Sequence, residues 1–92
     1  MASPDGRNAR TPYRVRVGDT WYWVDPTVPA HVLEAGDIVV IHSVSGPAHV
    51  AVLQEKFDPP REAHFATLEG ERFSLPAADI AALHLAAVDA AP

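Results

Sequence analysis

The chain has 92 residues, of which 48% are hydrophobic and 21% charged, with a formal net charge of −5 and no cysteine. This composition is typical of one globular domain rather than a disordered chain. The lack of cysteine excludes disulfide bonds, thiolate catalysis and cysteine-based zinc sites, and the acidic balance argues against extensive phosphate binding.

Charge is distributed unevenly along the chain. Residues 1–16 hold four arginines and one aspartate, a local charge of +3, whereas residues 17–92 hold three basic and eleven acidic residues, a local charge of −8. Residues 1–11 are polar and lack hydrophobic periodicity, which predicts a flexible N-terminal arm before a single domain at 12–88 and a short tail at 89–92. No apolar run suits a signal peptide or a membrane span, so we expect a cytoplasmic protein with no membrane partner.

The first element is a hairpin at residues 13–24, YRVRVGDTWYWV. Gly18-Asp19 is a two-residue turn of the kind that suits the strand twist, and it pairs residues whose numbers sum to 37. Because side chains alternate along a strand, the two faces differ. One face carries Tyr13, Val15, Val17, Tyr22 and Val24. The other, which we call the Arg/Trp face, carries Arg14, Arg16, Trp21 and Trp23.

The Arg/Trp face is the predicted partner-binding surface. Guanidinium groups beside indoles make cation–π pairs, and together they can anchor a partner's side chain or stack on bases. The acidic body favours a protein or peptide partner, with single-stranded nucleic acid, held by this face and the basic arm, as the alternative class. The competing interpretation is that the tryptophans belong to the core and cover the open face of the hairpin at 36–54, with the arginine stems along its edge.

A proline-containing loop at 25–30 leads to the central hairpin at 36–54, GDIVVIHSVSGPAHVAVLQ. If Ser45-Gly46 is a two-residue turn, paired numbers sum to 91 and His42 faces His49. One face then carries Val39, Ile41, Val50 and Val52, and the other carries Ile38, Val40, Ala51 and Leu53. Both faces are apolar, so each needs cover, either from the rest of the chain or from a second copy in a homodimer.

Facing histidines raise the question of a metal site. His42 and His49, with His64 or Glu62 as a third group, are of the types that bind zinc, but zinc needs three or four ligands converging at about 2.0–2.2 Å. The simpler hypothesis is a pair of half-buried histidines that repel when protonated and weaken the hairpin below about pH 6. We therefore expect no metal and no cofactor.

The remaining elements are a loop at 56–60, a strand at 62–68, a turn at Glu69-Gly70 and a strand at 71–75. The alanine-rich end predicts a helix at about 77–86 after Pro76; the rival is one helical turn at 77–83 and a closing strand at 84–88. The predicted fold is mainly β: a small barrel or bent antiparallel sheet of five to six strands, with an extra N-terminal hairpin and a short C-terminal helix.

The segments LEAGDIVV at 33–40, GERFSLP at 70–76 and IAAL at 80–83 carry a resemblance. They resemble small SH3-like barrels, which run L-x-x-G-D-x-V-x-V, two hairpin strands, a strand ending in proline and a single helical turn. The resemblance covers about residues 32–84 and leaves the hairpin at 13–24 as an addition. It implies a module that binds peptides, modified tails or nucleic acid.

A second likeness concerns catalysis. GDIVV at 36–40 followed by HVAV at 49–52 is similar to the strand half of papain-like cell-wall amidases of the CHAP type, in which His49 would match the general base. The nucleophilic cysteine of that family has no counterpart here, and a base without its nucleophile cannot perform the reaction. We therefore predict a non-catalytic interaction module, with a degenerate CHAP relative as a further alternative.

Overall fold

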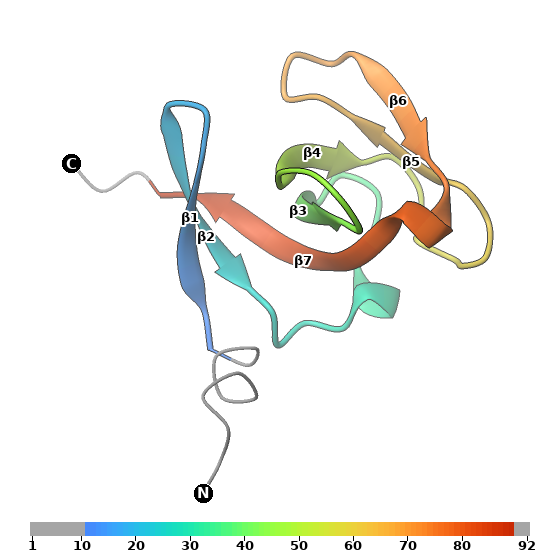
Figure 1. Cartoon of the computed structure of the whole chain (residues 1–92), viewed down its shortest axis with the longest axis horizontal. Helices are drawn as coiled ribbons and strands as arrows, with labels where there is room; N and C mark the ends of the chain where they lie inside the picture. The colour runs from blue at the N-terminus through green and yellow to red at the C-terminus, as the bar shows by residue number, and fades with distance from the viewer. Residues whose placement is uncertain (1–10, 90–92) are drawn as a thin grey trace, which may run out of the picture.

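The computed structural model describes residues 11–89, which form one open sheet of seven antiparallel strands in the order β1-β2-β7-β3-β4-β5-β6 (Figure 1). The strands are β1 Tyr13–Val17, β2 Thr20–Asp25, β3 Ile38–Ser43, β4 His49–Leu53, β5 Ala63–Ala66, β6 Arg72–Leu75 and β7 Ile80–Val88, with short 3-10 turns η1 Ala30–Val32 and η2 Ala77–Asp79. The predicted mainly-β class is confirmed, but there are seven strands rather than five to six.

The ends of the predicted domain plan fall largely outside this range. The expected flexible arm at 1–11 and tail at 89–92 lie outside the described residues, apart from residues 11 and 89. Within residues 11–89, no helix is long and apolar enough to cross a membrane.

The N-terminal hairpin is confirmed in register. Arg14 pairs with Trp23, Arg16 with Trp21, and the last pair before the turn is Val17 with Thr20. Gly18 has a φ of +63°, and glycine adopts this value without the steric cost that a Cβ brings, as the first central position of a tight hairpin turn requires.

The register of the central hairpin differs from the prediction by one residue. Ile38 pairs with Val52, Val40 with Val50 and Ile41 with His49, so paired numbers sum to 90 rather than 91. The turn is longer than two residues because β3 ends at Ser43, and the backbone N–H of Val44 donates to the carbonyl oxygen of Asp79 at 2.9 Å. A slip of one residue moves side chains to the opposite face, so His42 and His49 do not face each other.

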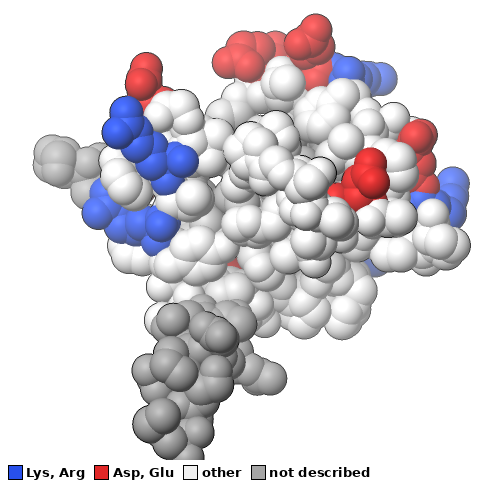
Figure 2. Space-filling model, viewed as in Figure 1, with Lys and Arg blue, Asp and Glu red and all other residues white. Residues whose placement is uncertain are grey.

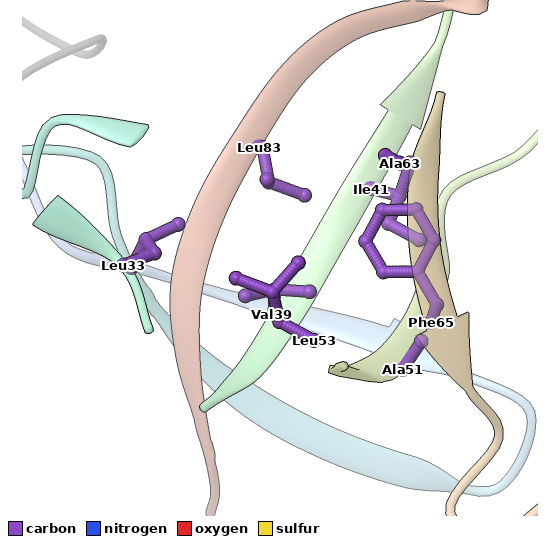
Figure 3. Packing of buried hydrophobic residues seen from close by; sticks show 8 residues of the cluster. All are labelled: Leu33, Val39, Ile41, Ala51, Leu53, Ala63, Phe65 and Leu83. Atoms are coloured by element: carbon purple, nitrogen blue, oxygen red, sulfur yellow. The ribbon is translucent and has the colours of Figure 1, made fainter. Parts of the chain in front are cut away.

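The corrected register gathers the largest core on one face of the sheet. Its buried residues are Leu33, Val39, Ile41, Ala51, Leu53, Ala63, Phe65 and Leu83 (Figure 3). Phe65 of β5 and Leu83 of β7 share this cluster although β5 and β7 are not neighbours in the sheet, so the sheet curls around it. The ring of Phe65 also stacks on Phe73 at a centroid distance of 5.5 Å.

The opposite face of the central hairpin is covered by the N-terminal hairpin. Val40 is fully buried in a second cluster with Val24 of β2 and Ala86 of β7. Partly buried side chains pack against it, namely Tyr13, Val15, Ile38, Ala48 and Val50. The chain itself therefore supplies cover to both faces, and the reason for invoking a second copy is removed.

The alanine-rich end forms a strand, so the predicted helix at 77–86 is wrong. The rival interpretation, a helical turn followed by a closing strand, is nearer: η2 is succeeded by β7, which begins at Ile80. β7 pairs with β3 on one side and with β2 on the other, through Ile41 with Leu83 and Val24 with Ala86. Two ladders and burial outweigh the helix preference of alanine, which amounts to a few tenths of a kcal/mol per residue.

A hairpin of β5 and β6 forms as predicted, but β5 ends at Ala66 rather than at residue 68 and β6 begins at Arg72, so the turn is longer than Glu69-Gly70. Ala63 pairs with Leu75 and Phe65 with Phe73. β1 and β6 remain as the two edges of the sheet, so the described residues form the bent open sheet rather than a closed barrel.

Candidate functional site

The tryptophans of the Arg/Trp face lie at the surface. Trp21 is 43% exposed and Trp23 46%, while Tyr22 and Val24, which alternate with them on β2, are buried. The competing interpretation, in which both indoles belong to the core, is therefore wrong. The core is filled instead by aliphatic residues, Phe65 and Tyr22.

Arg14 is fixed in place by two contacts. Its Cζ lies 4.7 Å from the centroid of the Trp21 ring, a cation–π contact with the indole diagonally across the strand pair rather than with Trp23, which is directly opposite. Its Nε lies 2.8 Å from Oδ2 of Asp89, whose side chain is only 7% exposed. Charge-assisted bonds of this length are strong, so Arg14 and Trp21 form a pre-ordered platform.

Arg16 is held more loosely. Its Nη2 lies 3.8 Å from Oδ1 of Asp19, and both side chains are well exposed. Its Nε donates to the carbonyl oxygen of Gly18 at 3.0 Å. An exposed ion pair at this distance contributes little, so the Arg16 guanidinium faces solvent as an accessible cation.

A shallow hollow of about 430 Å³ adjoins Trp23. Its lining is mostly apolar and includes Pro12, Leu85 and Ala87, with Asp25 also contributing. Hydrogen bonds from the hydroxyl and the backbone N–H of Thr27 lower the pKa of Asp25, so this carboxylate is charged and already engaged. The hollow extends the Arg/Trp face with an apolar surface.

The charges of this region balance locally. Arg14 and Arg16 are matched by Asp89 and Asp19, the two carboxylates that lie near them. Figure 2 shows basic side chains gathered over the hairpin of β1 and β2, and acidic side chains at the end where β5 and β6 join. The Arg/Trp face is thus basic in composition but not a large positive patch.

Sequence reasoning missed a contact between Tyr13, His42 and His84. The Tyr13 hydroxyl and His42 Nε2 lie 3.0 Å apart, and the rings of His42 and His84 meet edge to face at 5.6 Å. Burial and the neighbouring His42 lower the pKa of His84, against a smaller opposite effect of Asp25, and burial raises the pKa of Tyr13. The cluster joins β1 to β3 and β7, and it depends on the pairing of β3 with the C-terminal strand, which the sequence did not predict.

The histidines considered for metal binding are not brought together. His42 contacts Tyr13 and His84, His49 is exposed opposite Ile41, and His64 lies 3.8 Å from Glu55. Across residues 11–89, no group of three or more histidines and carboxylates is placed to hold a metal ion. The neighbour of His42 is therefore His84 rather than the predicted His49, and charge repulsion acts between His42 and His84 instead.

Another hollow, of about 470 Å³, lies over β5 and β6. Its charged side chains, Glu55, His64 and Arg72, are all exposed and of mixed sign, so they define no single ligand chemistry. The Arg/Trp face combines exposed indoles, ordered cations and an apolar hollow, and it is the better candidate. No family model, curated protein or solved structure matches the chain, so its function must be argued from this chemistry.

Proposed function

We propose that this domain is a non-catalytic module that binds a protein or peptide through the Arg/Trp face. The observation that carries the proposal is the half-exposed state of Trp21 and Trp23 beside an apolar hollow. Tryptophan and arginine are the residue types most enriched among the anchors of protein interfaces. An indole offers roughly 200 Å² of surface, so covering the exposed part of one contributes about 2 kcal/mol.

The local charge balance favours a protein partner over single-stranded nucleic acid. Phosphate binding draws its affinity from cations in excess, which release counterions from the nucleic acid. Here the face offers only two arginines, of which Arg14 is bonded to Asp89 and Arg16 is left as the accessible cation, so cations are not in excess. Stacking of bases on the exposed indoles is the feature that keeps nucleic acid as the alternative, and the salt dependence of binding discriminates between the two.

Other parts of the proposal rest on the sequence. The proposal of no catalysis is supported by the lack of the cysteine nucleophile that the CHAP-type reaction needs, and the likeness of residues 32–84 to SH3-like modules agrees with peptide binding. A homodimer formed through the central hairpin has lost its rationale, since the chain covers both hairpin faces. Sedimentation equilibrium at high concentration measures the oligomeric state directly.

The test compares three forms of the full chain: wild type, Trp21→Ala/Trp23→Ala, and Leu68→Ala as a control at another exposed apolar residue. Each is immobilised, and captured proteins from a lysate are quantified. We expect a set of proteins that the double variant loses and the control retains. In parallel, binding of a fluorescent oligo-dT is titrated at 50 and 200 mM salt.

Two results would contradict the proposal. If no captured protein depends on the tryptophans, the Arg/Trp face is not a protein-binding surface. If oligo-dT binds tightly to the wild type and its affinity falls steeply with salt, nucleic acid is the partner class instead.

A further inference from the structure

We infer that the free edge of β1 accepts an extended peptide as an additional strand, and that this peptide carries carboxylates at every second position. The inference rests on the proposed function and specifies its partner. It assigns the peptide a position along β1 and a side-chain pattern.

β1 is an edge strand with a regular backbone. β2 lies on one side of it, and no strand within residues 11–89 lies on the other. Its pairing with β2 runs from Tyr13 to Val17 without a shift of register. An edge presents a row of backbone N–H and carbonyl groups that another chain can pair with. The opposite edge, β6, is shorter and is followed at once by Pro76, which has no N–H to donate.

The charges of β1 disfavour a second copy of this chain as the added strand. Arg14 and Arg16 point to the same face, at alternate positions. In an antiparallel pair related by a two-fold axis, residues opposite each other come from the same face of both copies. Every register that pairs the middle of the strands therefore sets Arg14 or Arg16 opposite an arginine of the second copy. Like charges directly opposite each other are destabilising.

The same arginines favour carboxylates in the added strand. Arg16 has only a distant, exposed partner at 3.8 Å. Arg14 is already engaged, since its Nε bonds Asp89 and its guanidinium lies over the Trp21 ring of β2, so Arg16 is the main cation for the added strand. A peptide strand beside β1 would place two of its alternate side chains opposite these cations. Glutamate or aspartate at those positions forms cross-strand ion pairs.

The other face of β1 defines the residues between the carboxylates. Tyr13, Val15 and Val17 point there and are partly exposed. Val15 and Tyr13 already pack on the second cluster, so an apolar neighbour would extend this cluster. The fitting peptide thus alternates β-branched apolar residues with carboxylates, as in acetyl-Thr-Val-Glu-Val-Glu-Val-Thr-amide.

The experiment titrates the full chain with that peptide and with its lysine counterpart, acetyl-Thr-Val-Lys-Val-Lys-Val-Thr-amide. Binding is followed by backbone amide chemical shifts and by tryptophan fluorescence. We expect the glutamate peptide to bind about tenfold or more tightly than the lysine peptide, with the amide shifts centred on β1. N-methylation of the alternate peptide amides whose N–H groups point toward β1 should abolish binding, because the added strand pairs through its backbone.

A charge reversal separates this mechanism from general electrostatic attraction. Arg16→Glu should weaken the glutamate peptide by about tenfold and strengthen the lysine peptide. Arg72→Glu, at an exposed arginine of the other edge strand, is the matched control and should leave both affinities unchanged. Thermal unfolding verifies that Arg16→Glu folds; if it does not, Arg16→Gln, which removes the charge only, should reduce the preference for glutamate.

The inference is overturned if the two peptides bind equally or not at all, if the shifts centre on another strand, or if Arg72→Glu has the same effect as the Arg16 variant. These results are distinct from failure of the proposed function. A captured protein that depends on Trp21 and Trp23, together with no binding of the glutamate peptide, refutes strand addition and leaves the Arg/Trp face as a partner-binding surface.

Discussion

The hydrogen bond between Tyr13 and His42 gives the most informative test of how the N-terminal hairpin is attached. It joins the Tyr13 hydroxyl to His42 Nε2 at 3.0 Å in a partly buried position. Tyr13→Phe removes the hydroxyl and keeps the ring. A buried or partly buried hydrogen bond contributes about 0.5–1.5 kcal/mol net, so we expect the free energy of unfolding to fall by about 1 kcal/mol. For a domain of this size that corresponds to a Tm lower by about 4–8 °C.

The assay is urea unfolding followed by the fluorescence of Trp21 and Trp23, which both lie on β2 and report on the hairpin. A double-mutant cycle with His42→Gln isolates the pairwise contribution, which should be about 1 kcal/mol. Tyr22→Phe is the matched control. Tyr22 is a tyrosine on the same face of the hairpin whose hydroxyl makes no hydrogen bond within residues 11–89, so its change should cost less than about 0.5 kcal/mol.

Two outcomes would refute this reasoning. If Tyr13→Phe and Tyr22→Phe lower the stability equally, the hydroxyl of Tyr13 has no special role. If the cycle shows no coupling between Tyr13 and His42, the hairpin is attached by apolar packing of the second cluster alone. Hydrogen exchange of the β1 and β2 amides provides a local check, since loss of the bond should accelerate exchange there before the rest of the sheet.

Two further perturbations test the core and the histidine pair. Phe65→Ala removes a fully buried aromatic side chain, so urea unfolding should show a loss of about 3–5 kcal/mol; a loss below about 1 kcal/mol would mean that the main core is not organised around this ring. His84 has a pKa lowered by burial and by His42, so the unfolded chain binds more protons between the folded and unfolded pKa values. The stability contribution is therefore complete above about pH 6.5 and is lost as the pH falls toward the folded pKa. The Tm should decrease from pH 7.5 to pH 5, and less so in His84→Gln; equal slopes in both proteins would contradict this assignment.

The candidate site was largely accessible from local sequence. Gly18-Asp19 sets the loop length, so the register of the first hairpin and the composition of the Arg/Trp face follow directly. The exposure of Trp21 and Trp23 did not follow, because two strands with one polar and one apolar face still leave open which face packs against the body. The apolar face packs inward, and the aliphatic residues of β3, β4 and β7 fill the space that the indoles would otherwise occupy.

The central hairpin shows why the alternation of apolar and polar side chains does not always predict the register of a strand pair. Both faces of β3 and β4 are apolar, so shifting one strand by one residue exchanges one apolar set for another, and the sequence pattern does not favour either register. In the observed pairing, the Val44 N–H donates to the carbonyl oxygen of Asp79, a residue distant in sequence, rather than across a two-residue turn. The consequence reaches the histidines, since His42 meets Tyr13 and His84 instead of His49.

By itself, the sequence determined the class of fold, the existence of the hairpins and the pairing of the first one, because turn residues and strand periodicity act over a few neighbouring positions. Only the tertiary structure decided the strand at the C-terminus, the register of the central hairpin and the exposure of the tryptophans. Each of these depends on contacts between distant segments. The insertion of β7 between β2 and β3 satisfies backbone groups on both of its sides, and no local preference of its alanines could indicate that.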